Sequence, residues 1–216
     1  MREPTPTDGR RDAGARTKRR LIDTTLELLA ERGEDAVTLR DITGAAQTNI
    51  ASVSYHFGSL GALCCATTKH AITRLLEEQM SRLQALDGEA TVEQIARAVA
   101  QPIIGVLSDP DRPERALLRI FDRALGGPPG ELQDWVRAEL KRVDDELIAH
   151  LAVALPGVPE DELRFRWECA SGILRSLVKD GQRSDHCGKC AADLERLLLP
   201  VIAGTLSAGA VPSAAG

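Results

Sequence analysis

Residues 38–57 read T-L-R-D-I-T-G-A-A-Q-T-N-I-A-S-V-S-Y-H-F. Thr38 lies three residues before an aspartate, a spacing close to that of the capping box, in which two side chains bond the free amides at a helix start. We expect a first helix over residues 39–46, with an apolar stripe facing the core. Asn49 is a favourable N-cap for a second helix over residues 50–55. Two short helices joined by a tight turn predict a helix-turn-helix, whose second helix enters the DNA major groove.

The spacing of apolar residues predicts which faces of the two helices are buried. Leu39, Ile42 and Ala46 share one stripe of the first helix. In the second helix we expect Ile50 and Val53 to face inward, and the side chains between and after them to face outward.

A longer segment, residues 19–63, resembles the DNA-binding head of the tetracycline-repressor (TetR) family of transcriptional regulators. The resemblance is carried by L-I-D-T-T-L-E-L-L-A-E-R-G at residues 21–33, A-V-T-L-R-D-I at residues 36–42, and S-Y-H-F-G-S at residues 54–59 followed by Leu63. It implies an all-α fold, with an N-terminal three-helix head and a C-terminal helical bundle that dimerises. It also implies a transcriptional regulator, most often a repressor, that binds a pseudo-palindromic site on double-stranded DNA as a homodimer and is released by a small-molecule effector.

We expect DNA contacts from the basic start of the first helix, the start of the second helix, and the recognition helix with its flanking residues. These residues are Arg16, Lys18, Arg19, Thr38, Arg40, Thr48, Asn49, Ile50, Ala51, Ser52, Ser54, Tyr55 and His56. Residues 1–57 carry nine Lys/Arg and nine Asp/Glu, so the whole net charge of −5 falls on residues 58–216. Because this positive patch is modest, we expect affinity to depend on dimerisation and on salt.

The sequence departs from the family pattern at three places. Gln47 occupies the place of the usual turn glycine, which other polar residues can fill at some conformational cost. Ser54 precedes the tyrosine where an aromatic residue or Asn is common. Leu60 and Gly61 replace the family's Lys and Glu, so a lysine that lies near the DNA backbone in relatives is absent. The last departure bears on DNA affinity more than on fold.

The remainder of the chain is helical in pattern. We expect residues 1–15 to be a disordered basic arm, residues 16–63 the DNA-binding head, residues 64–208 the effector-binding and dimerisation body, and residues 209–216 a disordered tail. A helix capped by Ser59 should run to residue 86, and Pro102 should kink the one that follows. The further helices are expected at residues 91–107, 114–125, 131–155, 160–179 and 191–206.

The last two expected helices have apolar stripes wide enough to face both a core and a partner. The family resemblance implies that they form a four-helix bundle with their copies, through Leu163, Trp167, Ala170, Leu174, Leu177, Leu194, Leu197, Leu198, Val201 and Ile202. It also implies an effector pocket in the body. The candidate lining residues are Phe121, Trp135, His150, Phe165 and Arg166.

Composition and motifs exclude several other classes of protein. No apolar run approaches the roughly 20 residues of a membrane span, and no apolar segment of a secretory signal follows the N-terminus, so we expect no membrane partner and a cytoplasmic address. No G-x-S-x-G, P-loop, Rossmann or H-E-x-x-H pattern occurs, so we expect no enzyme and no cofactor.

The pair Cys187 and Cys190 leaves a second interpretation open. A C-x-x-C pair can bind zinc or act as a dithiol, which would make the chain a thiol or metal sensor. Structural zinc takes four ligands, however, and we therefore expect no metal site. A third interpretation, favoured by Leu60 and Gly61, is a helical interaction protein that has lost DNA binding.

Overall fold

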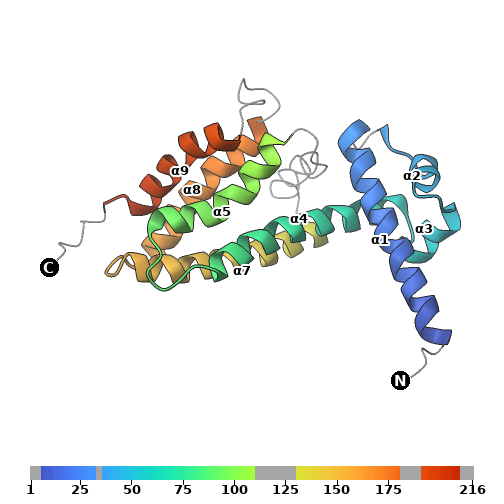
Figure 1. The fold of residues 1–216 in the computed structure, drawn as a ribbon, viewed down its shortest axis with the longest axis horizontal. Helices are drawn as coiled ribbons and strands as arrows, with labels where there is room; N and C mark the ends of the chain where they lie inside the picture. The colour runs from blue at the N-terminus through green and yellow to red at the C-terminus, as the bar shows by residue number, and fades with distance from the viewer. Residues whose placement is uncertain (1–5, 33–35, 110–129, 181–190, 210–216) are drawn as a thin grey trace. The chain divides into compact units, whose positions relative to one another are not determined.

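The computed structural model describes residues 6–32, 36–109, 130–180 and 191–209. All regular structure in these ranges is helical (Figure 1), which confirms the predicted all-α class. The expected helix at residues 114–125 and the pair Cys187 and Cys190 lie outside the described residues. None of the described helices is long and apolar enough to cross a membrane.

The chain divides into two compact units, residues 1–71 and residues 72–216. Unit 1 contains α1 (Pro6–Arg32), α2 (Leu39–Ala45), α3 (Ile50–Phe57) and the first part of α4 (Leu60–Gln84). The helices α1, α2 and α3 all contact one another. Their shared core is built from Leu21, Leu26, Leu29, Ile42, Ala46, Val53 and Leu63.

The start of α1 differs from the prediction. The helix begins at Pro6, so the segment of residues 6–15, which was expected to be disordered, is helical. Proline suits the first helical position, because its φ angle is already near the helical value and its missing N–H would have no partner there. Ala13 and Ala15 are strong helix formers that carry the helix on to Arg16. Residues 6–15 of the arm that was predicted to be disordered are thus a helical extension of α1.

Unit 2 contains the second part of α4 with α5 (Val92–Ser108), α7 (Glu131–Ala154), α8 (Glu160–Asp180) and α9 (Ala191–Ser207). Helix α5 packs against α7, α8 and α9, and α8 also contacts both α7 and α9. Figure 1 shows α5, α8 and α9 side by side. The largest fully buried side chains of this unit are Leu83, Ile95, Ile104, Leu147, Leu151, Leu163, Ile202 and Leu206.

Local signals place the starts of α4 and α5 close to where they were predicted. The Ser59 hydroxyl accepts a hydrogen bond from the Ala62 amide at 3.1 Å, which caps α4. Thr91 and Gln94 form a reciprocal capping box at the start of α5. Pro102 lies inside α5 without ending it.

Candidate nucleic-acid interface

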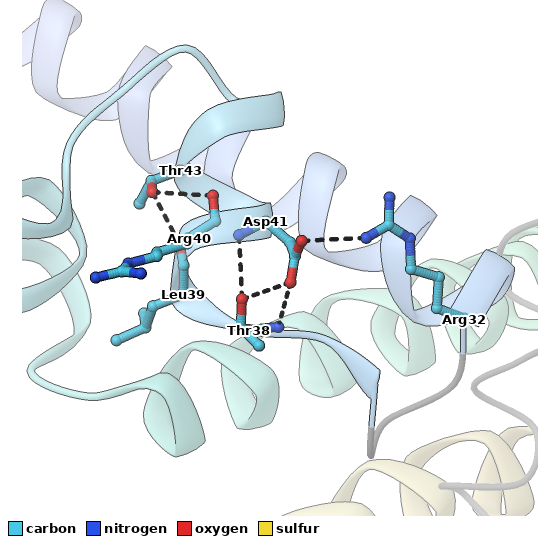
Figure 2. A network of polar contacts seen from close by, with 6 residues as sticks. All are labelled: Arg32, Thr38, Leu39, Arg40, Asp41 and Thr43. Atoms are coloured by element: carbon cyan, nitrogen blue, oxygen red, sulfur yellow. Dashed lines mark hydrogen bonds and ion pairs between the residues drawn. The ribbon is translucent and has the colours of Figure 1, made fainter.

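The start of α2 is fixed by the predicted capping box, which Figure 2 shows from close by. The Asp41 amide donates to the Thr38 hydroxyl oxygen at 3.3 Å. In return, the Asp41 carboxylate accepts hydrogen bonds from the Thr38 amide at 3.0 Å and from the Thr38 hydroxyl. Arg32, at the end of α1, donates to the other carboxylate oxygen at 3.2 Å. These bonds anchor α2 to α1.

The same contacts lower the pKa of the Asp41 carboxyl below its ordinary value. The hydrogen bond from the Thr38 side chain is the main cause, followed by the Thr38 backbone N–H, and the charge of Arg32 adds to them. Thr38 was predicted to contact DNA. Its hydroxyl is already engaged in the cap.

The turn between α2 and α3 is a Schellman motif. The Thr48 amide donates to the Thr43 carbonyl at 2.9 Å, and the Gln47 amide donates to the Gly44 carbonyl at 3.2 Å. Gln47 has a φ of 49°, the left-handed conformation that glycine usually supplies at this position. The expectation that a polar residue fills the glycine position is confirmed.

The start of α3 is held by a network of short polar side chains. Asn49 is the N-cap, and its side-chain oxygen accepts from the Ser52 amide at 2.9 Å. The Ser52 hydroxyl also donates to this oxygen, at 3.0 Å, and accepts from the Thr48 hydroxyl at 2.9 Å. The hydroxyls of Thr48 and Ser52, both expected to contact DNA, therefore bond each other.

One face of α3 is exposed among the described residues of unit 1. Val53 is buried as predicted, whereas Ala51 and Ser54 are exposed and Tyr55 is 84% exposed. The prediction that Ile50 faces inward is wrong, because its side chain is 46% exposed. The outward face of α3 therefore begins with two aliphatic side chains and ends with a hydroxyl and a phenol.

The extension of α1 lies beside the C-terminal end of α3. A Cβ atom added to Gly14 would stand 3.8 Å from Cε1 of His56, and the Lys18 ammonium lies 5.9 Å from the centre of the Phe57 ring. His56 is half-buried and packs edge-to-face against Tyr55, with 4.9 Å between ring centres. This packing could not be predicted from the sequence, because it depends on the part of α1 that precedes Arg16.

The other predicted DNA contacts in unit 1 are accessible. Arg16, Lys18 and Arg40 are exposed. Arg19 is also exposed, and its guanidinium pairs with the Asp23 carboxylate at 3.0 Å, one turn along α1. The structure thus places Lys18 of α1 next to α3, on the same unit that carries the exposed α3 face.

Among the residues that the structure describes, none of those predicted to line an effector pocket borders the groove described in the next paragraph. Phe165 is 64% exposed. Arg166 is buried and ties α8 to α9, because it donates to the Leu206 carbonyl at 3.1 Å and pairs with Glu162. Trp135 and His150 are half-buried on α7, and Phe121 lies outside the described residues.

A groove of about 240 Å³ lies instead between α4 and α7. Its apolar walls come from Leu76, Met80 and Val143. Its polar walls come from Thr73, Glu77, Ser81, Gln84, Glu139 and Arg142. Sequence reasoning missed these residues, because nothing in the spacing shows which faces of two amphipathic helices stay apart.

Most of the residues predicted at a dimer interface serve the core of the protomer. Buried within the chain itself are Leu163, Ala170, Leu174, Leu194, Leu198 and Ile202. Their stripe packs α8 and α9 against each other and against α5, so it is not available to a partner. Trp167 is half-buried and donates to the Asp144 carboxylate at 2.6 Å, and the side chain of Leu177 is not described.

Leu197 and Val201 are exposed, as an interface requires. The outward faces of α8 and α9 also carry exposed residues that were not among those predicted at the dimer interface. These are Phe165, Cys169, Pro200 and Gly204.

Comparisons with known proteins agree with this architecture. The family described as "Bacterial regulatory proteins, tetR family" matches residues 21–64, and "Tetracyclin repressor-like, C-terminal domain" matches residues 97–208. The HTH-type transcriptional repressor Rv3405c of Mycobacterium tuberculosis is 32% identical over 166 residues, which cover 73% of this chain and 75% of the relative.

Solved structures share the fold at lower identity. SCO4454, a TetR-family transcriptional regulator from Streptomyces coelicolor, superposes with a TM-score of 0.66 at 18% identity, covering 89% of this chain and 95% of that one. AibR, solved in complex with isovaleryl coenzyme A and operator DNA, gives a TM-score of 0.59 at 17% identity, covering 88% of this chain and 97% of that one. From the capped helix-turn-helix, the helical body and these matches together, the chain belongs to the TetR family of bacterial transcriptional regulators.

Proposed function

We propose that this protein is a repressor that binds a pseudo-palindromic DNA operator as a homodimer and is released by a small-molecule effector. The observation that carries the proposal is the free outward face of α3, held by caps at its start and by a buried Val53 behind. A recognition helix docks by its N-terminal residues, of which Ile50 and Ala51 are exposed here. The relative Rv3405c is described as a repressor, which supports repression rather than activation.

Charge on the same unit supports the backbone contacts. Arg16 and Lys18 on α1 and Arg40 on α2 are exposed cations, which suit phosphate oxygens. Tyr55 is exposed and can donate its phenol to a phosphate. His56, packed between Tyr55 and α1, can hold the phenol in place as well as bond the backbone.

The outward faces of α8 and α9 support dimerisation. Leu197, Val201 and Phe165 are exposed apolar side chains, and Gly204 has open space within 4 Å of its Cβ position. A second copy covering this stripe would bury it around a two-fold axis. Two recognition helices would then read half-sites about 10 bp apart.

The groove between α4 and α7 is our candidate effector site. Helix α4 is continuous and contributes residues to both units. A ligand that displaces Leu76 and Met80, which line the groove, would therefore act on a helix that also belongs to unit 1. A ligand that binds more tightly to a dimer whose two recognition helices are not spaced to fit the half-sites would release the operator. The coenzyme A ester bound to AibR makes acyl-CoA thioesters the first compounds to test.

The proposal is tested by selecting bound sequences from a random DNA pool at two salt concentrations, with stoichiometry from light scattering. We expect a palindromic site, two protomers on each duplex, and an affinity that falls steeply with salt. Tyr55→Ala should weaken binding to the selected site without unfolding the protein. Failure of the well-folded protein to enrich any sequence would contradict the proposal and support loss of DNA binding.

The effector step is tested on the selected operator by adding isovaleryl coenzyme A and longer acyl-CoA thioesters. We expect one of them to release the duplex, and Met80→Trp, which fills the groove, to abolish that release while DNA binding persists. Release that is unchanged in Met80→Trp would move the effector site elsewhere.

A further inference from the structure

Among the described residues of unit 1, large apolar side chains are exposed on one helix only. Of the large hydrophobic residues in unit 1, Ile50 and Tyr55 alone are exposed, and both lie on α3. Tyrosine carries a polar tip that water can solvate. Isoleucine has none, so covering its exposed side chain with an apolar partner would be favourable.

On the outward face of the first turn of α3, Ile50 lies beside one other aliphatic side chain, Ala51. The oxygen atoms of Thr48, Asn49 and Ser52 bond one another as described above. The exposed hydroxyl of Ser54 lies one turn further along the helix. Ile50 and Ala51 themselves present only methyl and methylene groups to whatever lies opposite.

The major groove offers one apolar partner to such a surface. Its edges carry the polar N7 and O6 of guanine, the amino groups of adenine and cytosine, and the C5-methyl group of thymine. Against Ile50, a guanine or cytosine edge would lose water without gaining a hydrogen bond, which is unfavourable. Contact between Ile50 and a thymine methyl group is favourable, because it removes apolar surface of both groups from water.

We infer that Ile50 and Ala51 read the C5-methyl groups of thymine in each operator half-site. This inference rests on the proposed function, since it specifies which bases the recognition helix contacts. It leaves other positions of the half-site to the exposed polar side chains, of which Arg40 on α2 and Gln47 in the turn can donate to bases or phosphates.

The test replaces thymine by deoxyuridine in the selected operator duplex, which removes one methyl group and leaves base pairing unchanged. We expect affinity to fall roughly fourfold for each contacted methyl, and by the square of that factor when both half-sites are substituted. Ile50→Ala should discriminate between thymine and uracil duplexes much less than the unaltered protein does, and Ile50→Val should discriminate to an intermediate degree.

Val153→Ala is the matched control, because Val153 is an aliphatic side chain on α7 with 62% exposure. It should discriminate as the unaltered protein does. Circular dichroism of Ile50→Ala should match that of the unaltered protein, since an exposed side chain is removed.

The outcomes separate this inference from the proposed function. Absence of any sequence-specific binding removes both. A specific, palindromic site that is bound equally well with thymine or uracil keeps the proposed function and overturns the reading of thymine. A selected half-site without thymine, or an Ile50→Ala variant that weakens both duplexes by the same factor, overturns it as well.

Discussion

Threonines occupy several buried positions around the head, where an aliphatic residue of the same shape would fit. Thr25, Thr43 and Thr68 each donate a hydroxyl to the carbonyl four residues earlier, at 2.6, 2.8 and 2.9 Å respectively. Thr67 on α4 is also fully buried, and its hydroxyl has no hydrogen-bond partner among the described residues. A buried hydroxyl without a partner is unfavourable, so this residue weakens the fold.

Thr67→Val should raise the free energy of unfolding by about 1 kcal/mol, because it removes an unsatisfied polar group and keeps the shape of the side chain. Urea denaturation of the whole chain measures the effect. Thr25→Val is the control, since its hydroxyl is bonded; its stability should not rise by a comparable amount. Equal gains in both variants would contradict the assignment of an unpaired hydroxyl to Thr67.

The left-handed residue in the turn gives a second prediction at this scale. A residue other than glycine in this conformation costs about 1–2 kcal/mol, so Gln47→Gly should stabilise the chain by about 1 kcal/mol, part of the gain being offset by greater freedom of the unfolded chain. Gly58, with a φ of 82° and nothing near its Cβ position, supplies the opposite case. Gly58→Ala should lower stability through backbone strain alone. Thermal unfolding of both variants should show shifts of opposite sign.

At the scale of elements, α2 depends on one carboxylate at its start. Asp41 closes the capping box and also pairs with Arg32 of α1, so its charge serves both the helix and its attachment. Its pKa in the folded protein is lower than in the unfolded chain. Stability from this group is therefore complete above the unfolded pKa, near 4, and is lost as the pH falls through the folded pKa.

Asp41→Asn should lower the unfolding temperature at pH 7, and the difference from the unaltered protein should shrink as the pH falls below about 4. Thermal unfolding from pH 3 to pH 8 at constant ionic strength measures this. Arg32→Gln should have a smaller effect, since Thr38 rather than Arg32 is the main cause of the lowered pKa. A difference of the same size at pH 3 and pH 7 would rule out the carboxylate as the source.

The helix starts could be predicted from the sequence, because caps are local. Thr38, Asn49 and Ser59 each act within three residues of themselves, and all three cap as expected. The buried and exposed faces of the helices were harder to predict. Ile50 has the spacing of an inward residue, but α3 is short and Val53 alone reaches the core. The extension from Pro6 was missed because its sequence has no apolar stripe.

At the scale of the whole molecule, the spacing of apolar residues does not distinguish the face of α8 and α9 that packs in the core from the face that contacts a partner. Both helices carry two apolar faces, and the sequence does not say which one the protomer uses for itself. The structure shows that the face with Leu163 and Ile202 is buried and the face with Leu197 and Val201 is exposed. The exposed face is the one that we propose for the second copy.

Val201→Glu should convert the dimer to a monomer, because it places a charge in the middle of the proposed interface. Light scattering at a fixed protein concentration reads the mass directly. The monomer should bind the selected operator much more weakly, since it keeps only one recognition helix. Val153→Glu, a change of the same kind at another exposed aliphatic site, should leave both mass and affinity unchanged. A dimer in both variants would place the interface elsewhere.

The aliphatic face of α3 also has a calorimetric consequence. Operator DNA that covers Ile50 and Ala51 removes apolar surface from water, and such burial gives association a negative change in heat capacity. DNA without the site leaves that face wet and holds the protein through phosphates alone. The binding enthalpy for the operator should therefore become more negative with rising temperature faster than the enthalpy for unrelated DNA. The temperature dependence of the binding enthalpy thus distinguishes sequence-specific binding from binding to DNA of any sequence.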